Sequence, residues 1–119
     1  NAAASGSNRP YSLVISDERS RYGRHIAAEV SSAIRDAEIP GLDRCITREG
    51  TPTEWTNGLN TIKGIYEGPN NIAGICFEPY FLDNHRHHYA AGIEGGERIG
   101  AAMAVGLNEY FQNRRRRVY

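Results

Sequence analysis

The first half of the chain alternates short runs of β-forming residues with one long amphipathic segment. Residues 11–16, YSLVIS, and residues 44–49, RCITRE, have the length and composition of short strands. Between them, residues 21–37 repeat apolar side chains at three- and four-residue steps, which predicts a helix with one buried face. That face comprises Tyr22, Ile26, Val30, Ala33 and Ile34. The order strand, helix, strand predicts an α/β fold with a mixed or largely parallel sheet flanked by helices.

Polar and turn-forming residues mark both ends of this helix. Ser16, Asp17 and Ser20 are candidate N-caps, because their side-chain oxygens can accept hydrogen bonds from the first free backbone N–H groups. Pro40 and Gly41 are expected to end the helix and turn the chain.

The second half of the chain contains one ambiguous segment and two that are easier to interpret. Residues 59–66, LNTIKGIY, fit either a strand or a helical turn. Residues 72–77, IAGICF, are expected to form the most buried strand. Residues 95–111 predict a second helix, and because its glycines weaken it, we expect packing against the sheet to hold it. One face of that helix carries Ile99, Met103, Leu107 and Tyr110.

The composition bounds the class of protein. A chain of 119 residues has the length of one domain, and 39% hydrophobic with 24% charged residues is typical of globular proteins. The formal net charge of zero argues against nucleic-acid binding by the domain as a whole, and no apolar run approaches the ~20 residues of a membrane span. We expect residues 1–113 to form the domain and residues 114–119 a basic tail. Cys45 and Cys76 are expected to be free, buried thiols.

Glu78 follows the apolar run directly and is the main candidate for a catalytic group. Open α/β sheets place functional groups at the carboxyl ends of their strands. Pro79 removes a competing N–H, and Phe77, Tyr80 and Phe81 could exclude water. Glu78 is therefore a candidate general base or metal ligand. The alternative is a strand-end charge that reaches solvent or caps a helix.

The segment NHRHHY gathers three of the four histidines of the chain. His85 and His87 on an extended segment could face one way and, with Asp83, contribute to a zinc site. The alternative is a polar surface loop that includes His88. His25 is expected on a solvated helix face, and the arginines at 114–117 on a solubilising tail.

Two stretches together carry a resemblance to a known family. AGICFEPYFLDN, followed by ERIGAAMAVGLNEYF, resembles the C-terminal portion of zinc-dependent N-acetylmuramoyl-L-alanine amidases of the Amidase_3 type, which include phage endolysins and autolysins. The matching elements are the apolar strand at 72–77, Glu78, the aromatic turn at 81–84 and the helix at 98–110. Upstream, YSLVIS, GRHIAAEVSSAI and LDRCITRE follow one another as similar segments do in that family.

The resemblance implies a three-layer amidase-like fold, incomplete at its N-terminus, and a reaction. The amide between N-acetylmuramic acid and L-alanine in peptidoglycan would be cleaved by zinc-activated water, with Glu78 as general base. Tyr80, Phe81 and Asn84 would line the substrate cleft, although Tyr80 stands where the family commonly has a small residue. The zinc ligands, two histidines and a glutamate, are expected upstream of Asn1, so the chain alone is expected to be inactive. The implied site of action is the bacterial cell wall, outside the cytoplasmic membrane or in the periplasm. The protein would be phage-encoded and lack a signal peptide of its own.

A non-catalytic function is the alternative. A cell-wall-binding or phage structural component could use the same fold, with Trp55 in GTPTEWTNG as an aromatic platform for glycan. Trp55 could equally be a partly buried loop anchor.

Overall fold

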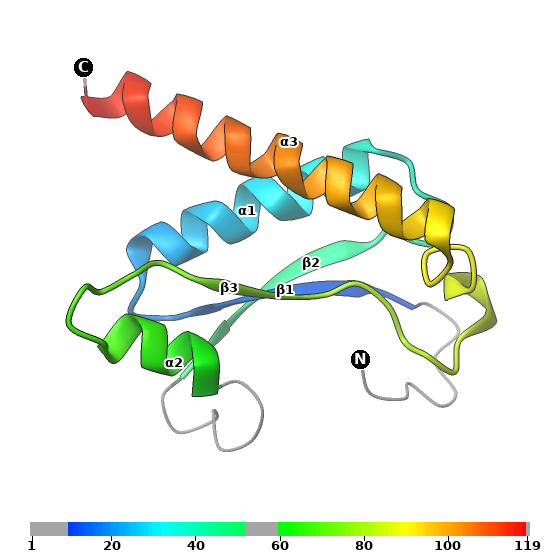
Figure 1. Ribbon diagram of the computed structural model, residues 1–119, viewed down its shortest axis with the longest axis horizontal. Coiled ribbons are helices and arrows are strands. Elements are labelled where there is room, and N and C mark those ends of the chain that lie inside the picture. The colour runs from blue at the N-terminus through cyan, green and yellow to red at the C-terminus, as the bar shows by residue number, and fades with distance from the viewer. Residues whose placement is uncertain (1–9, 52–59, 119) are drawn as a thin grey trace.

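The computed structural model describes residues 10–51 and 60–118, which form a three-layer α/β fold. A sheet lies between α1 and α3 on one face and α2 on the other (Figure 1). The α/β class and the mixed sheet predicted from the sequence are therefore confirmed. In chain order the elements are β1 (Ser12–Asp17), α1 (Arg21–Asp36), β2 (Cys45–Gly50), α2 (Asn60–Glu67), β3 (Ile75–Glu78), the 3-10 turn η1 (His85–His87) and α3 (Ile93–Val118).

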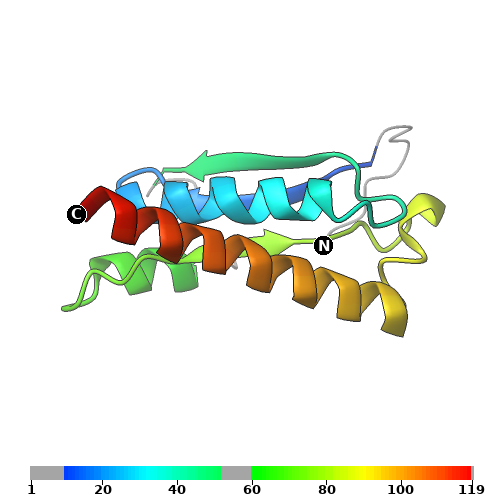
Figure 2. The same cartoon turned by 90° about the horizontal axis from the view of Figure 1, so that it is seen from above.

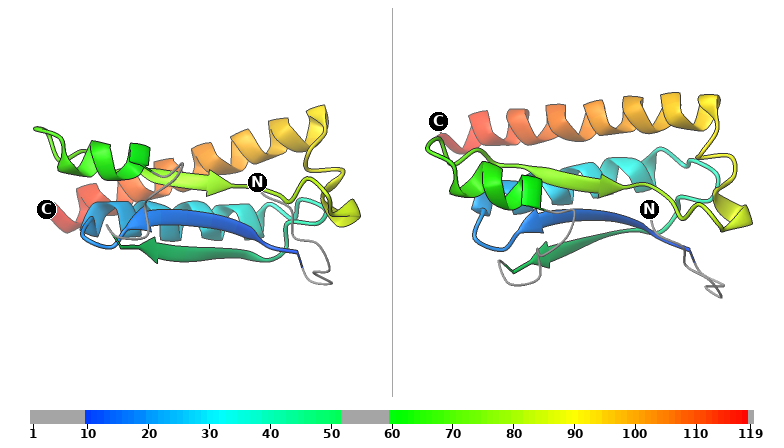
Figure 3. Two further views of the ribbon diagram at one scale, coloured as in Figure 1. Left: turned by 90° about the horizontal axis from the view of Figure 1, so that it is seen from below. Right: turned by 60° about the horizontal axis from the view of Figure 1, so that its bottom comes forward.

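The sheet has the strand order β2-β1-β3, so β1 is the central strand. β1 pairs with β2 in parallel, with Ser12 opposite Cys45, and with β3 in antiparallel, with Leu13 opposite Glu78. Figure 3 shows β1 between the other two strands. All six residues of β1 are buried, because the strand is paired on both edges and covered on both faces.

The prediction that residues 72–77 form the most buried strand is wrong. The observed strand, β3, spans Ile75–Glu78, and all four of its residues are only half-buried. It pairs with β1 alone among the described strands, so its second edge is uncovered there. A run of apolar residues shows that a strand contacts a core, but not whether it is central or lies at an edge.

α1 forms as predicted and packs its apolar face over the sheet. Of the three candidate N-caps, Ser20 is the one that caps it, since its hydroxyl accepts a hydrogen bond from Gly23 N at 3.0 Å. Its buried apolar residues join Val14 and Cys45 in the main core. They are Ile26, Ala27, Val30 and Ile34. Tyr22, predicted on this face, is instead 49% exposed.

α2 settles the ambiguity of residues 59–66 in favour of a helix. It covers the opposite face of the sheet from α1, where the buried Ile62 contacts Leu13 and Ile15 of β1. Tyr11 and Cys76 border this smaller core.

α3 is longer than predicted and continues through the arginines at 114–117. It packs mainly on α1 rather than on the sheet, with Ile99, Ala102 and Tyr110 buried in the main core. The two helices run antiparallel, since Arg98 near the start of α3 donates to Ala37 O, and Asn113 near its end donates to Glu29 Oε1. No described helix combines the length and apolar character needed to cross a membrane.

Gly106 permits the close approach of α3 to α1. A Cβ atom at this position would lie 2.7 Å from Val30 Cα and 2.9 Å from Glu29 O, both of them backbone atoms that cannot move independently. We therefore expect Gly106→Ala to lower the free energy of unfolding by about 1–3 kcal/mol, measured by urea denaturation. Gly64→Ala is the matched control, because open space surrounds its Cβ position in α2. It should raise stability by about 0.5–1 kcal/mol. Equal effects of the two substitutions would contradict this account of the helix contact.

Candidate functional site

Glu78 is the last residue of β3 and so lies at the carboxyl end of that strand, as the sequence predicted. Because β3 is antiparallel to β1, its last residue lies beside Leu13, near the start of β1. The carboxyl ends of the parallel strands β1 and β2 lie at the other end of the sheet, where Asp17 is opposite Gly50. Glu78 therefore lies at the carboxyl end of its own strand, as predicted, but at the end of the sheet opposite to the carboxyl ends of β1 and β2. Strand direction is set by the pairing of distant segments, which the local sequence does not reveal.

The Glu78 side chain is half-buried on the face of the sheet that α2 covers. Residues two apart in a strand share a face, so Glu78 lies on the same side as Cys76, which borders the α2 core. Within the part of the chain that the structure describes, its carboxylate makes no hydrogen bond and no ion pair. Its carboxylate is therefore not engaged by any other described residue.

Tyr80, Phe81 and Asn84, which were predicted to line a substrate cleft, do not line an open cleft beside Glu78. Tyr80 is half-buried and packs against the main core, whereas Cys76, on the side of Glu78, borders the smaller one. Phe81 is buried, with its ring edge-to-face on Tyr11 at a centroid separation of 5.1 Å. Asn84 is also buried and caps η1, since its side-chain oxygen accepts from Arg86 N at 3.0 Å.

His87 is a structural residue at the centre of this turn. Only 1% of it is exposed, its ring stacks on Phe81 at 6.1 Å, and its Nδ1 accepts a hydrogen bond from Phe81 N at 2.8 Å. Because Nδ1 accepts, the ring proton of the neutral form is on Nε2. Burial lowers the pKa of His87, with weaker opposing effects from the backbone of Gly41 and the charge of Asp43. His87 is therefore held neutral at pH 7.

The three clustered histidines do not converge on one point. η1 buries His87 and exposes His85 and His88, so the hypothesis that His85 and His87 face one way fails. Among residues 10–51 and 60–118, no three His, Cys, Asp or Glu side chains are grouped so that they could hold a metal ion. Both cysteines are free; Cys45 is buried and Cys76 half-buried, and burial raises the pKa of each thiol.

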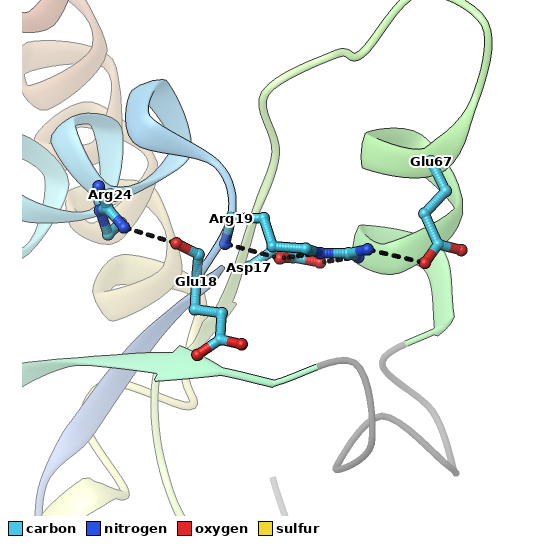
Figure 4. A network of polar contacts seen from close by, with 5 residues as sticks. All are labelled: Asp17, Glu18, Arg19, Arg24 and Glu67. Carbon is cyan, nitrogen blue, oxygen red and sulfur yellow. Dashed lines mark hydrogen bonds and ion pairs between the residues drawn. The ribbon is translucent and has the colours of Figure 1, made fainter.

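A polar network that the sequence did not reveal occupies the carboxyl end of β1 (Figure 4). Asp17 is fully buried, and Arg19 binds it in a bidentate manner, with Nη2 to Oδ2 at 2.6 Å and Nε to Oδ1 at 2.9 Å. Arg19 Nη1 also donates to Glu67 Oε1 at 2.9 Å, and its guanidinium lies 4.6 Å from the centre of the Tyr66 ring. Arg19 therefore ties β1 to α2.

This network is suited to holding structure rather than to moving protons. The hydrogen bonds from Arg19 keep the pKa of Asp17 below its usual range, although burial opposes them. Asp17 thus stays ionised at neutral pH with both oxygens engaged. The sequence signal was an acid two residues before an arginine at a strand end, but Glu67 lies 48 positions away and is invisible to local patterns.

A groove of about 630 Å³ lies between α1 and α3, and Glu78 is not among the residues that line it. It is lined by alanines with Val105, and by charged residues that include Glu29, Asp36, Arg98 and Glu109. A second cavity of about 90 Å³ lies between Pro10, Gly41 and Arg86. Trp55, the candidate glycan platform, lies outside the described residues.

Comparison with known proteins adds no relative. No protein-family model matches the chain, and neither a curated protein nor a solved structure matches it.

The lowered pKa of His87 predicts a pH dependence. A group whose pKa is lower in the folded state stabilises the fold above its unfolded pKa of about 6.5, and this stability is lost as the pH falls through the folded pKa. We expect the free energy of unfolding to fall as the pH drops below about 6.5. In His87→Gln the loss of stability that His87 causes below this pH should be absent. The exposed control His85→Gln should show the same loss as the wild type. Denaturant titrations at several pH values measure this, and an unchanged slope in His87→Gln would refute the assignment.

Removing Arg19 tests the network at the end of β1. Arg19→Met should destabilise the fold at pH 7, because it leaves the carboxylate of Asp17 buried without its cation. Since the pKa of Asp17 is lowered in the folded state, the stability from this pair is present above pH 3.8 and lost as the pH falls further. The difference in the free energy of unfolding between the wild type and Arg19→Met should therefore become smaller in acid. Arg24→Met, which removes an exposed 3.6 Å ion pair with Glu49 and an exposed hydrogen bond to Glu18 O, is the control, with an expected change within about 0.5 kcal/mol.

Proposed function

We propose that this chain is the distal portion of a peptidoglycan hydrolase, a zinc-dependent N-acetylmuramoyl-L-alanine amidase, and that Glu78 is its general base. The observation that carries the proposal is the state of the Glu78 carboxylate. It is half-buried at a strand end and, among the described residues, has neither a hydrogen bond nor an ion pair. The resemblance of residues 72–84 to the amidases supports the same residue.

The chemistry assigned to Glu78 is proton transfer in amide hydrolysis. Its carboxylate takes a proton from the attacking water as the water adds to the carbonyl carbon between N-acetylmuramic acid and L-alanine. It then returns that proton to the leaving nitrogen as the C–N bond breaks. Asp17, a buried carboxylate at the opposite end of the sheet, cannot replace it, because Arg19 occupies both of its oxygens.

Zinc is the cofactor that the resemblance implies, and when bound it would lower the pKa of water and polarise the amide. The described residues do not fit a zinc site, since no three of their donors converge. Any zinc would therefore take its ligands from residues other than these. Those ligands would have to hold the zinc within reach of Glu78, because a general base must contact the water whose proton it takes.

The proposed partner and place of action follow from the substrate. Peptidoglycan is the proposed ligand, which puts the reaction at the bacterial wall, as in a phage lysis enzyme or an autolysin. Tyr80, Phe81 and Asn84 support the turn after Glu78, so their contribution to this function is to fix the carboxylate in place.

Glu78→Gln tests the proposal in the full-length gene product. Purified peptidoglycan is the substrate, and the readout is the release of L-alanine amino groups. We expect the rate to fall by about 10²–10⁴-fold, since glutamine cannot accept the proton. Bound zinc, measured by elemental analysis, should stay at the wild-type level, because Glu78 is not proposed as a ligand.

Glu97→Gln on the exposed part of α3 is the matched control and should keep wild-type activity. The 119-residue chain should be inactive by itself. Wild-type turnover by Glu78→Gln would remove Glu78 from the mechanism. A full-length protein that binds peptidoglycan with neither zinc nor hydrolysis would favour the alternative of a wall-binding component.

A further inference from the structure

His87 lies where two loops meet at one end of the molecule. One loop, residues 37–44, joins α1 to β2, and the other, residues 79–92, joins β3 to α3. Figure 2 shows the two loops side by side beyond the last turn of α1. A Cβ atom added to Gly41 would overlap Arg86 O and lie 3.5 Å from His87 Cδ2. The loops are therefore in direct contact, and the ring of His87 is part of that contact.

The ring of His87 is held by a hydrogen bond at only one of its two nitrogens. Its Nδ1 accepts from Phe81 N at 2.8 Å, and its plane stacks on the Phe81 ring. Its Nε2 is buried and has no hydrogen-bond partner among the described residues. A buried N–H group without an acceptor lowers the stability of the arrangement that buries it. The closed position of the ring therefore depends on one hydrogen bond and on packing.

A protonated His87 does not fit this closed position. The imidazolium ring donates from both nitrogens and accepts at neither. Its Nδ1–H would point at the N–H of Phe81, so that two donors face each other inside a site where His87 is 1% exposed. Its Nε2–H would carry part of the charge without an acceptor. Because a buried charge without partners is costly, the ring must move into water when it takes up the proton.

The surrounding charges do not compensate for this cost. Asp43, on the α1–β2 loop, is the carboxylate whose charge favours the protonated ring, but burial outweighs it and keeps the pKa of His87 below its usual range. Arg44 and Arg86 line a small cavity together with Asp43 and Gly41, and they bring two positive charges to the same junction. The other titratable side chains of the segment around His87 are exposed, and they are Asp83, His85 and His88.

Both ends of the segment that contains His87 are anchored independently of its ring. Before it, β3 pairs with β1 as far as Glu78, and Tyr80 packs against the main core. After it, Arg98 of α3 donates hydrogen bonds to Tyr89 Oη at 3.3 Å and to Ala37 O at 3.0 Å. The intervening residues, 81–88, can therefore move while the elements on either side keep their contacts.

We propose that residues 81–88 form a pH-sensitive segment, which detaches from the α1–β2 loop when His87 takes up a proton, while the sheet, α1 and α3 stay folded. The open state binds one proton more than the closed state, and it uncovers the ring of Phe81. This differs from a general loss of stability in acid, because one segment opens at a lower cost than the whole fold. The proposal does not rest on the function proposed for Glu78.

Hydrogen exchange of the full-length gene product, followed by mass spectrometry between about pH 7 and pH 4.5, tests the segment. The amides of Asn84, His87 and Ala91 report on it, because each donates to a carbonyl oxygen of the segment. We expect their opening constant to rise by about tenfold for each pH unit below about 6.5, since opening frees His87 to bind a proton. At every pH it should exceed the opening constant of the β1 amides by at least about tenfold.

His87→Asn is the test variant, because the asparagine oxygen can accept from Phe81 N in place of Nδ1 and takes up no proton in this range. Its segment should show no rise of the opening constant in acid, whereas the exposed control His85→Asn should behave as the wild type. Circular dichroism at neutral pH ensures that only folded variants are compared. An NMR titration of the wild-type imidazole needs no variant, and the protonation of His87 should coincide with the opening of the segment.

Three outcomes would overturn the proposal. Equal opening constants for the segment and for β1 would mean that His87 is protonated only in the globally unfolded chain. An opening constant of the segment that does not change with pH would show that His87 is not coupled to it. The same pH dependence in His87→Asn as in the wild type would assign the effect to another group.

Discussion

The central strand β1 is the constraint on which the remaining structure depends. It is paired on both edges and covered by α1 on one face and Ile62 of α2 on the other, so all six of its residues are buried. A strand in this position must satisfy every backbone group through its neighbours. Its single buried charge, Asp17, sits at its very end, where Arg19 can reach it. Every layer of the fold is thus organised around one short segment.

The parts of the fold that were predictable are those with local causes. The period of α1, the hydroxyl of Ser20 and the turn at Pro40 and Gly41 act within a few residues, and the helix forms between them. α2 was ambiguous because an eight-residue segment supports either period. The edge position of β3 was not predictable, because it depends on partners distant in the chain.

The same division separates the two carboxylates of interest. Glu78 could be singled out from its place after an apolar run, but its direction in the sheet could not. Asp17 was taken for a cap candidate, since nothing local shows that Arg19 would fold back on it while also reaching Glu67. Their environments therefore differ. Both oxygens of Asp17 accept hydrogen bonds from Arg19, whereas the carboxylate of Glu78 has no partner among the described residues.

The position of β3 as an antiparallel edge strand also suggests which part of the molecule unfolds first. β1, α1 and β2 form a contiguous unit held by parallel pairing and the main core, and β3 joins it through one short ladder and through the packing of Ile75 and Phe77 on that core. Detaching β3 together with the turn that follows it would leave that unit intact. Partial unfolding of this kind is the cooperative release of a local substructure at a cost below that of global unfolding. The carboxylate of Glu78 therefore sits on the shortest strand of the sheet, and its position depends on that ladder and on the packing of β3 on the core.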